Sequence, residues 1–196
     1  MNAAVIDVTK FGAKNDGSGD NAAALDAAVR ELKARNGGEL YFPSGEYRIT
    51  TRRRAALLLD GLSDVTVRFA PGAVLLMDNL QKDGKGGGHG VVVRGPAANI
   101  AFRFEGFPDD AKTISRIYLL NCTGENSPQT GAVFMGCSDI FVNNFSPVNT
   151  WADGLHFNAC RRVSVDGVRG IGNGDDTLAF VTYYAEKFTG QTGTVF

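Results

Sequence analysis

Hydrophobic and polar positions follow two different periods along the chain. In residues 22–34, Leu25, Val29 and Leu32 recur at intervals of three and four residues among alanines. This spacing predicts one amphipathic α-helix. Asp20 stands where a side chain can cap the first turn of that helix. No later segment has a convincing helical period, so we expect strands alone after the helix.

The rest of the chain consists of short apolar runs bounded by turn residues, which is the pattern of β-strands. The predicted strands are residues 39–43, 47–50, 57–59, 65–69, 74–77, 91–94, 100–104, 117–120, 132–135, 140–145, 155–157, 163–165 and 178–181.

The later strands repeat one another at an interval of 23 residues. At this offset Gly131 aligns with Gly154, while Phe134, Phe157 and Phe180 fall into one column. Several short strands in a repeat of this length predict a solenoid of parallel coils. A leucine-rich repeat has the same period, but its regular leucine pattern is absent, and a sandwich or barrel is the remaining alternative.

A coil of this kind stacks like residues about 4.8 Å apart. We therefore expect the phenylalanine column to form a ladder inside the solenoid. Strand alternation then directs three residues outward, namely Val133, His156 and Ala179. We divide the chain into an N-terminal cap, residues 1–50, and a series of coils, residues 51–196, within a single all-β domain.

Composition and charge limit the kinds of binding partner that we expect. The 196 residues have a net charge of −1, which gives no electrostatic reason to expect nucleic acid or an anionic membrane as a partner. No apolar run approaches the about 20 residues of a membrane span, and no signal peptide begins the chain. Three cysteines do not form a disulfide framework. Cys137 and Cys160 align in the repeat, and we expect them to stay reduced. Neither a metal cluster nor a cofactor motif is evident.

The strongest chemical signal is a set of three aspartates in register. Asp153 and the pair Asp175-Asp176 each precede a short apolar run, one repeat apart. The coils therefore bring three carboxyl groups together, and crowding of like charges favours one protonated carboxyl beside an ionised one. A single aspartate before glycine or threonine is more often a turn residue. Three in register favour acid/base catalysis such as glycoside hydrolysis.

Three N-terminal segments resemble the cap of pectate-lyase-superfamily β-helix proteins. They are Val5-Ile-Asp-Val-Thr-Lys-Phe-Gly-Ala-Lys-Asn-Asp-Gly, Asp20-Asn-Ala-Ala-Ala-Leu-Asp-Ala-Ala and Gly38-Glu-Leu-Tyr-Phe-Pro-Ser-Gly-Glu-Tyr. This resemblance implies a right-handed parallel β-helix with a short capping helix. Hydrolases, lyases, epimerases and phage tailspikes share the fold, so the resemblance is specific for fold and not for chemistry.

Two later segments resemble the motifs of polygalacturonase-type glycoside hydrolases. Asn149-Thr150-Trp-Ala-Asp153-Gly resembles the Asn-Thr-Asp motif, and Gly174-Asp175-Asp176 resembles the motif with paired aspartates. The resemblance implies inverting hydrolysis of a polysaccharide without a cofactor. Asp175 would be the general acid, and Asp153 with Asp176 would activate water. It also implies an extracellular or periplasmic parent protein.

The chain departs from that pattern in two ways. Trp151-Ala152 interrupt the first motif, and the family's later Gly-His-Gly and Arg-x-Lys motifs are missing. One further repeat from Asp176 reaches position 198 or 199, beyond Phe196. We therefore expect a shortened β-helix, whose exposed last coil would favour self-association.

Four residues near the aspartates are candidates for substrate binding. His156 would bind hydroxyl groups or tune a carboxyl, or it is an ordinary outward histidine. Trp151 would stack on a sugar ring or pack within a turn. Arg161 and Arg162 would pair with a uronate carboxylate, or they are exposed corner cations.

Two other functions stay open beside hydrolysis. The same fold serves lyases and epimerases, which remove the C5 proton of a uronate with a basic residue, often beside calcium. It also serves non-catalytic glycan-binding proteins such as tailspikes. Product chemistry separates these possibilities.

Overall fold

The computed structural model describes residues 5–51, 55–79, 89–93, 102–106 and 114–182. Contacts divide the chain into two compact units, Met1–Val92 and Val93–Phe196. Every pair of strands within the described residues is parallel. The structure confirms the predicted right-handed parallel β-helix with one short α-helix near the N-terminus.

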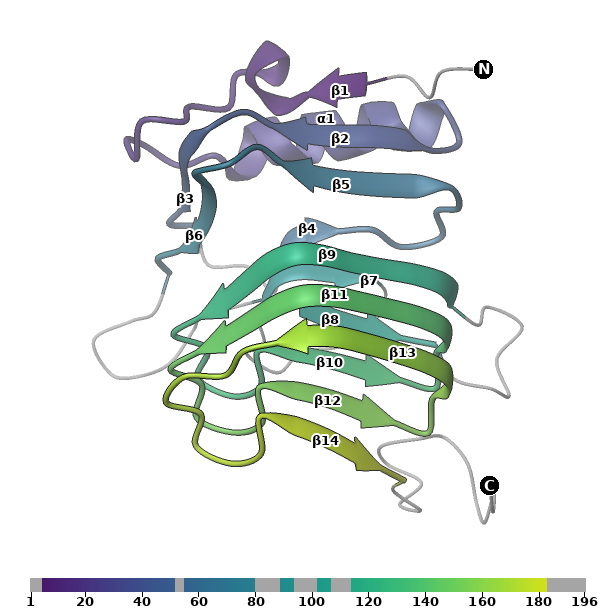
Figure 1. Cartoon of the computed structure of the whole chain (residues 1–196). Helices are drawn as coiled ribbons and strands as arrows, with labels where there is room; N and C mark the ends of the chain where they lie inside the picture. The colour runs from purple at the N-terminus through teal and green to yellow at the C-terminus, as the bar shows by residue number, and fades with distance from the viewer. Residues whose placement is uncertain (1–4, 52–54, 80–88, 94–101, 107–113, 183–196) are drawn as a thin grey trace. The chain divides into compact units, whose positions relative to one another are not determined.

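The first unit contains the helix and the early coils (Figure 1). Its elements are β1 (Val5–Asp7), the 3-10 helix η1 (Val8–Phe11), α1 (Ala22–Ala34), β2 (Gly38–Phe42), β3 (Gly45–Ile49), β4 (Ala55–Leu58), β5 (Val65–Phe69) and β6 (Ala73–Met77). The strand β7 (His89–Val93) begins in this unit and pairs with β4. Strands β1, β2 and β5 form one sheet, and β3 pairs with β6.

The helix α1 has the predicted bounds and the predicted apolar stripe. It packs against β1, β2 and β4 and buries Leu25, Val29 and Leu32. The capping residue is Asn21 and not Asp20 as predicted, and the Asn21 side chain makes no capping hydrogen bond because it accepts one from the Lys14 N–H instead. Asp20 still accepts a hydrogen bond from the Ala22 N–H. No helix among the described residues is long and apolar enough to cross a membrane.

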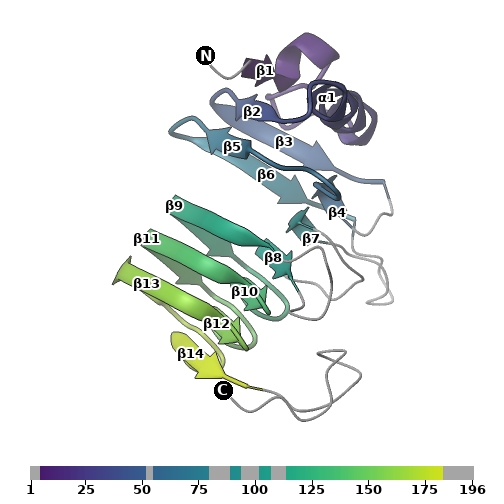
Figure 2. The same ribbon diagram turned by 90° about the vertical axis from the view of Figure 1, so that its right-hand side faces the viewer.

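The second unit consists of successive coils with two parallel sheets. Its strands are β8 (Phe102–Glu105), β9 (Ser115–Glu125), β10 (Ala132–Met135), β11 (Ser138–Val148), β12 (Leu155–Asn158), β13 (Arg161–Val168) and β14 (Leu178–Val181). Strands β8, β10, β12 and β14 lie side by side in one sheet, and β9, β11 and β13 in another (Figure 2).

The predicted register and the predicted aromatic ladder are both confirmed. Phe134 pairs with Phe157, which pairs with Phe180. Phe104 extends the ladder by one rung, and the ring centroids are 4.6–5.0 Å apart. Phe134 is fully buried, whereas Phe180 on the last described strand is 60% exposed. The core of this unit is therefore a stack of like residues, as the repeat requires.

The other face of this sheet differs from the prediction. Val133, His156 and Ala179 alternate with the phenylalanines, but all three are buried rather than exposed to solvent. Glu105 and Asn158 on the same sheet are also buried. Strand alternation fixes which face a residue occupies, but the remainder of the chain decides whether that face is covered.

Bends within the long strands and just after them fall in columns that keep the coils in register. Asn121 and Asn144 have left-handed backbones, and so do Asn126 and Asn149. Each pair is joined by a side-chain amide hydrogen bond across 23 residues, of 2.9 Å and 2.7 Å respectively. Asparagine tolerates the left-handed conformation better than most residues, and stacking satisfies its polar groups. Cys137 and Cys160 are free thiols, as expected, and burial raises the pKa of Cys137.

Candidate active site

The three aspartates lie at the N-terminal ends of two adjacent strands. Asp153 precedes β12, and Asp176 precedes β14. The Gly154 N–H donates to the Asp176 carbonyl at 2.8 Å, which places Asp176 directly beside Asp153 on neighbouring coils. Asp175 is the residue before Asp176 in the same turn. The predicted stacking of Asp176 on Asp153 is therefore present.

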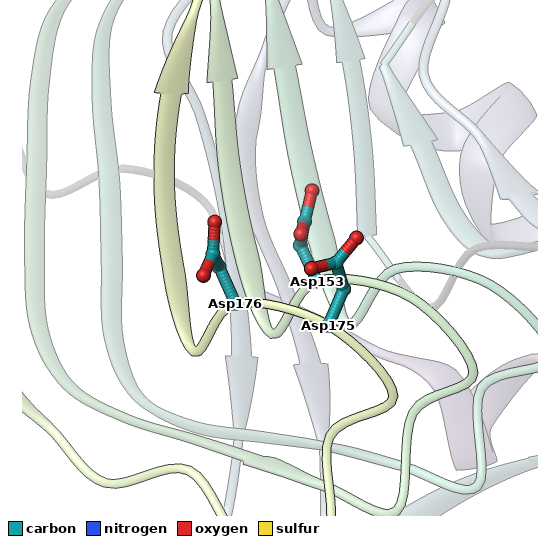
Figure 3. A group of neighbouring side chains, drawn as sticks. All are labelled: Asp153, Asp175 and Asp176. Carbon is teal, nitrogen blue, oxygen red and sulfur yellow. The ribbon is translucent and has the colours of Figure 1, made fainter.

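The three carboxylates converge at this edge of the sheet (Figure 3). One oxygen from each lies within 4.8 Å of the others. Asp153 is half-buried, while Asp175 and Asp176 are exposed. Carboxylate oxygens at this spacing are also able to share a cation such as Ca²⁺, which the sequence spacing had not indicated.

The described contacts of Asp175 and Asp176 differ from those of turn-forming aspartates elsewhere in the chain. Asp7 and Asp16 each accept a hydrogen bond from the backbone N–H two residues later, as turn-forming aspartates do. Within the described chain, neither the Asp175 nor the Asp176 carboxylate accepts such a bond. Two full negative charges 4.8 Å apart repel each other by about 1 kcal/mol even in bulk water. Gathering these charges therefore costs folding stability, and no described hydrogen bond of the Asp175 or Asp176 carboxylate offsets that cost.

His156 is paired with one of the three carboxylates. Its Nδ1 lies 2.5 Å from Asp153 Oδ2, and the two side chains are 9% and 14% exposed. This contact orients the Asp153 carboxylate from within the sheet. The sequence placed His156 on the same coil as Asp153, but it did not show that the two side chains would bond.

Two glycines set the backbone of the site. A Cβ on Gly174 would lie 2.3 Å from the Trp151 carbonyl oxygen, and one on Gly154 would lie 2.7 Å from that of Thr177. Both contacts are shorter than any side chain permits, so these positions require glycine. Gly174 allows the turn carrying Asp175 to lie against the turn before Asp153. Sequence reasoning missed this role, although both glycines stand next to the aspartates.

A polar network supports the same two turns. Thr150 Oγ1 donates to the Ala152 carbonyl at 2.8 Å and contacts Asn173 Oδ1 at 3.1 Å. The Asn173 amide donates to Thr177 Oγ1 at 3.0 Å. Side chains of neighbouring coils thus fix each turn to the next. Thr150 belongs to the motif that Trp151-Ala152 interrupt, and its side chain holds two turns together here.

The predicted substrate-binding residues occupy different places. Trp151 is 83% exposed, which excludes packing of its indole within the turn. Arg161 and Arg162 begin β13, so all of β12 separates them from Asp153. Arg162 forms a two-point ion pair with Asp139, at 2.5 Å and 2.7 Å, and this guanidinium holds the pKa of Asp139 below its usual range. The structure thus brings Trp151 and His156 near Asp153, but not the two arginines.

The chain is a parallel β-helix protein with an acidic site. Its carboxylates gather at the strand ends of one sheet. The family model described as "Rhamnogalacturonase A/epimerase, pectate lyase-like" matches residues 5–184. The chain belongs to this family. This finding confirms the resemblance that the N-terminal segments carried.

Curated relatives share only short segments with the chain. Mannuronan C5-epimerase AlgE3 of Azotobacter vinelandii is 46% identical over 45 residues, 23% of this chain and 2% of the relative. Alginate lyase 7 of the same organism is 46% identical over 43 residues, 22% of this chain and 5% of the relative. The matched segments are thus a small part of these proteins.

Solved structures share the fold. A GH87 α-1,3-glucanase from Streptomyces thermodiastaticus superposes with a TM-score of 0.60 at 22% identity, over 94% of this chain and 34% of the other. PfbA, a surface adhesin of Streptococcus pneumoniae, gives 0.61 at 15% identity, over 96% and 45%. One is an enzyme and one an adhesin, so the fold alone does not assign the chemistry.

Proposed function

We propose that this chain acts on a polysaccharide and hydrolyses its glycosidic bonds with Asp153, Asp175 and Asp176. The convergence of the three carboxylates within 4.8 Å, with no turn-forming hydrogen bond to Asp175 or Asp176 among the described residues, carries this proposal. Family membership supports a polysaccharide as the substrate.

In this reaction Asp175 is the general acid. It gives its proton to the glycosidic oxygen while the bond between that oxygen and the anomeric carbon breaks. A water molecule, deprotonated by Asp153 or Asp176, forms the new bond to the same carbon. Asp175 is exposed and faces substrate, whereas Asp153 is half-buried and held by His156. The exposed Trp151 offers a stacking surface for an adjoining sugar ring.

The stereochemical course has to be measured. Most inverting enzymes separate their carboxyl groups by about 6.5–9.5 Å, and retaining enzymes by about 5–5.5 Å. The oxygens of this cluster approach one another more closely than the first range. The geometry therefore supports carboxylate catalysis without favouring the inverting course that the motif resemblance implies.

A second candidate function is a lyase or epimerase reaction on a uronate polymer. The sequence relatives named as mannuronan C5-epimerase and alginate lyase favour it. Here a base removes the C5 proton. A lyase then expels the C4 oxygen with formation of a double bond, and an epimerase returns a proton to the opposite face. His156 is suited to act as the base, and the three carboxylates are close enough together to hold a cation.

One experiment separates these readings. The chain is incubated with pectic, alginate and neutral polysaccharides, and three products are followed: new reducing ends, unsaturated uronate absorbance and C5-inverted residues. Hydrolysis predicts reducing ends without absorbance, reduced by about 10²–10⁴-fold in Asp175→Asn. Asp78→Asn, the same change at an exposed carboxylate of the other unit, serves as the control and keeps full activity.

Two results would reject hydrolysis. Unsaturated or C5-inverted products would assign the chain to the second function. Binding of a glycan without any turnover, unchanged in Asp153→Asn, would make it a non-catalytic glycan-binding protein.

A further inference from the structure

A short aromatic stack lies on the outer face of the sheet β9–β11–β13. Tyr118 and Phe141 pair in register, and their rings are 5.1 Å apart with an interplanar angle of 10°. Tyr118 is 61% exposed and Phe141 is 43% exposed. The apolar surface is therefore an ordered feature of two adjacent strands rather than a scatter of isolated side chains.

The stack ends at β13, where the residue in register with Phe141 is Ser164. Ser164 is exposed, and its small side chain leaves the second face of the Phe141 ring open. The inner ladder shows the contrast, because Phe134 lies between two other rings and is fully buried. The open face of the Phe141 ring thus lies next to the Ser164 hydroxyl group.

Hydrogen-bonding groups flank this open face on both sides. Arg162 stands two residues before Ser164 and is held by Asp139. Asp166 stands two residues after it and accepts a hydrogen bond from the Asn143 amide at 3.1 Å. Both flanking residues are exposed and belong to the same strand as the serine. We name the set Phe141, Arg162, Ser164 and Asp166 the outer notch.

We propose that the outer notch binds one neutral hexopyranose ring of a polysaccharide, on a different sheet from the aspartate cluster. A pyranose with equatorial hydroxyl groups presents C–H groups to an aromatic face. The hydroxyl groups around its edge form hydrogen bonds with protein donors and acceptors. Phe141 meets the first need, and Ser164, Asp166 and Arg162 meet the second.

The charges of the notch decide between neutral and acidic sugars. Asp139 pairs with Arg162 and is also attracted by Arg116, so these three groups together with Asp166 carry no net charge and give a uronate carboxylate no net attraction. The exposed large apolar side chains of β9 and β11 are only Tyr118, Leu120 and Phe141 within the described residues, whereas a stable protein interface takes about 20–30 residues from each partner. A sugar ring therefore fits the notch better than a second protein.

The proposal takes only the class of ligand, a polysaccharide, from the proposed function, and it is tested by binding. The probe is cellohexaose, titrated calorimetrically into the unmodified chain and into Ser164→Phe. The introduced ring extends the stack and covers the open face of Phe141, so affinity falls about tenfold. Phe141→Ala gives the same loss, while Leu120→Ala, a change at an exposed apolar residue of β9 outside the notch, keeps the affinity within about twofold.

Chemical shifts of the backbone amides locate the bound sugar. Cellohexaose is expected to shift Ser164 and Asp166, and these shifts persist in Asp175→Asn. Unchanged affinity in Ser164→Phe with an unchanged melting temperature would overturn the proposal, as would the absence of cellohexaose binding. A dimer in sedimentation that Ser164→Phe dissociates would show instead that the notch binds another copy of the chain.

Failure of the proposed function gives a different result. If Asp175 has no role in turnover, or if no polysaccharide is cleaved, cellohexaose binding at the notch is unaffected.

Discussion

At the scale of single residues, two members of one short motif have different tasks. Asn149 has a left-handed backbone and bonds to Asn126 on the preceding coil. Asp153, four residues later, faces the two other carboxylates and bonds to His156. A motif identified by sequence thus contains one residue that shapes the coil and one that we propose carries the chemistry.

The role of Asn149 predicts a stability effect. Asn149→Ala loses the amide hydrogen bond. It also places alanine, which tolerates the left-handed conformation less well than asparagine, at this position, and the two effects together cost about 1–2 kcal/mol. Asn149→Gly relieves the conformational part and is the milder variant. Urea denaturation measures both, and equal losses in the two variants would contradict the conformational argument.

The contact of His156 with Asp153 predicts an effect on turnover rather than on substrate affinity. His156→Ala frees the Asp153 carboxylate and lowers kcat about tenfold or more, with KM little changed. His156→Asn keeps an amide N–H near the position of Nδ1 and restores part of the rate. A fall confined to KM would indicate instead that His156 binds substrate hydroxyl groups.

At the scale of elements, the sequence predicted what the repeat controls. The helix at 22–34 follows from its own apolar period, and the pairing of Phe134 with Phe157 follows from the coil repeat. The strand at Val5–Asp7 was not predicted, and β9 and β11 have 11 residues each, more than the predicted runs 117–120 and 140–145. The partner of Arg162 follows the same spacing, because Asp139 lies 23 residues before it. The burial of the outer face of β12 is different. Spacing alone does not contain that information.

The inner ladder predicts unequal costs for two phenylalanines. Phe157 is 1% exposed between two rings, so Phe157→Ala removes a buried side chain and costs about 3–5 kcal/mol. Phe141 is 43% exposed and loses far less on the same change. Thermal and urea unfolding compare the two variants. Equal losses would show that the ladder does not determine stability.

The start of α1 predicts a response to acid. Burial alone would raise the pKa of Asp20, but hydrogen bonds from the Thr51 hydroxyl and from the Ala22 and Thr50 N–H groups bring it below the ordinary value of 3.8. A depressed folded-state pKa stabilises the fold above the unfolded-state value, and this contribution is lost as pH falls through the folded-state value.

Urea titrations between pH 7 and pH 2.5 test this response. We expect stability to fall below about pH 4, and to fall less in Asp20→Asn, which has no carboxyl to titrate there. An identical loss in both proteins would assign the acid response to other carboxylates.

At the scale of the whole molecule, the described stack ends on an apolar rung. Phe180 stacks on Phe157 at 5.0 Å, yet it is 60% exposed, and Leu178 beside it is 39% exposed. Within the described residues β14 pairs on one side only, with β12, and an unpaired strand edge promotes association. We expect the chain to self-associate in sedimentation, and Phe180→Glu to reduce it. Trp151→Glu, a change at a more exposed aromatic, leaves it unaltered. A monomeric unmodified chain would refute this expectation.

The extracellular or periplasmic location stays a prediction from the resemblance. The central claim of the account is that the carboxylates from two coils act as one catalytic unit. Residues that act as a unit give strongly non-additive losses when they are changed together.

Single-turnover rates test this claim most directly. They are measured on the polysaccharide that the chain cleaves, for the unmodified chain, Asp153→Asn, Asp175→Asn and the double variant. The account predicts that each single change removes most of the rate and that the double variant is about as slow as the slower single one. Independent, multiplying losses, or full activity in either single variant, would contradict it.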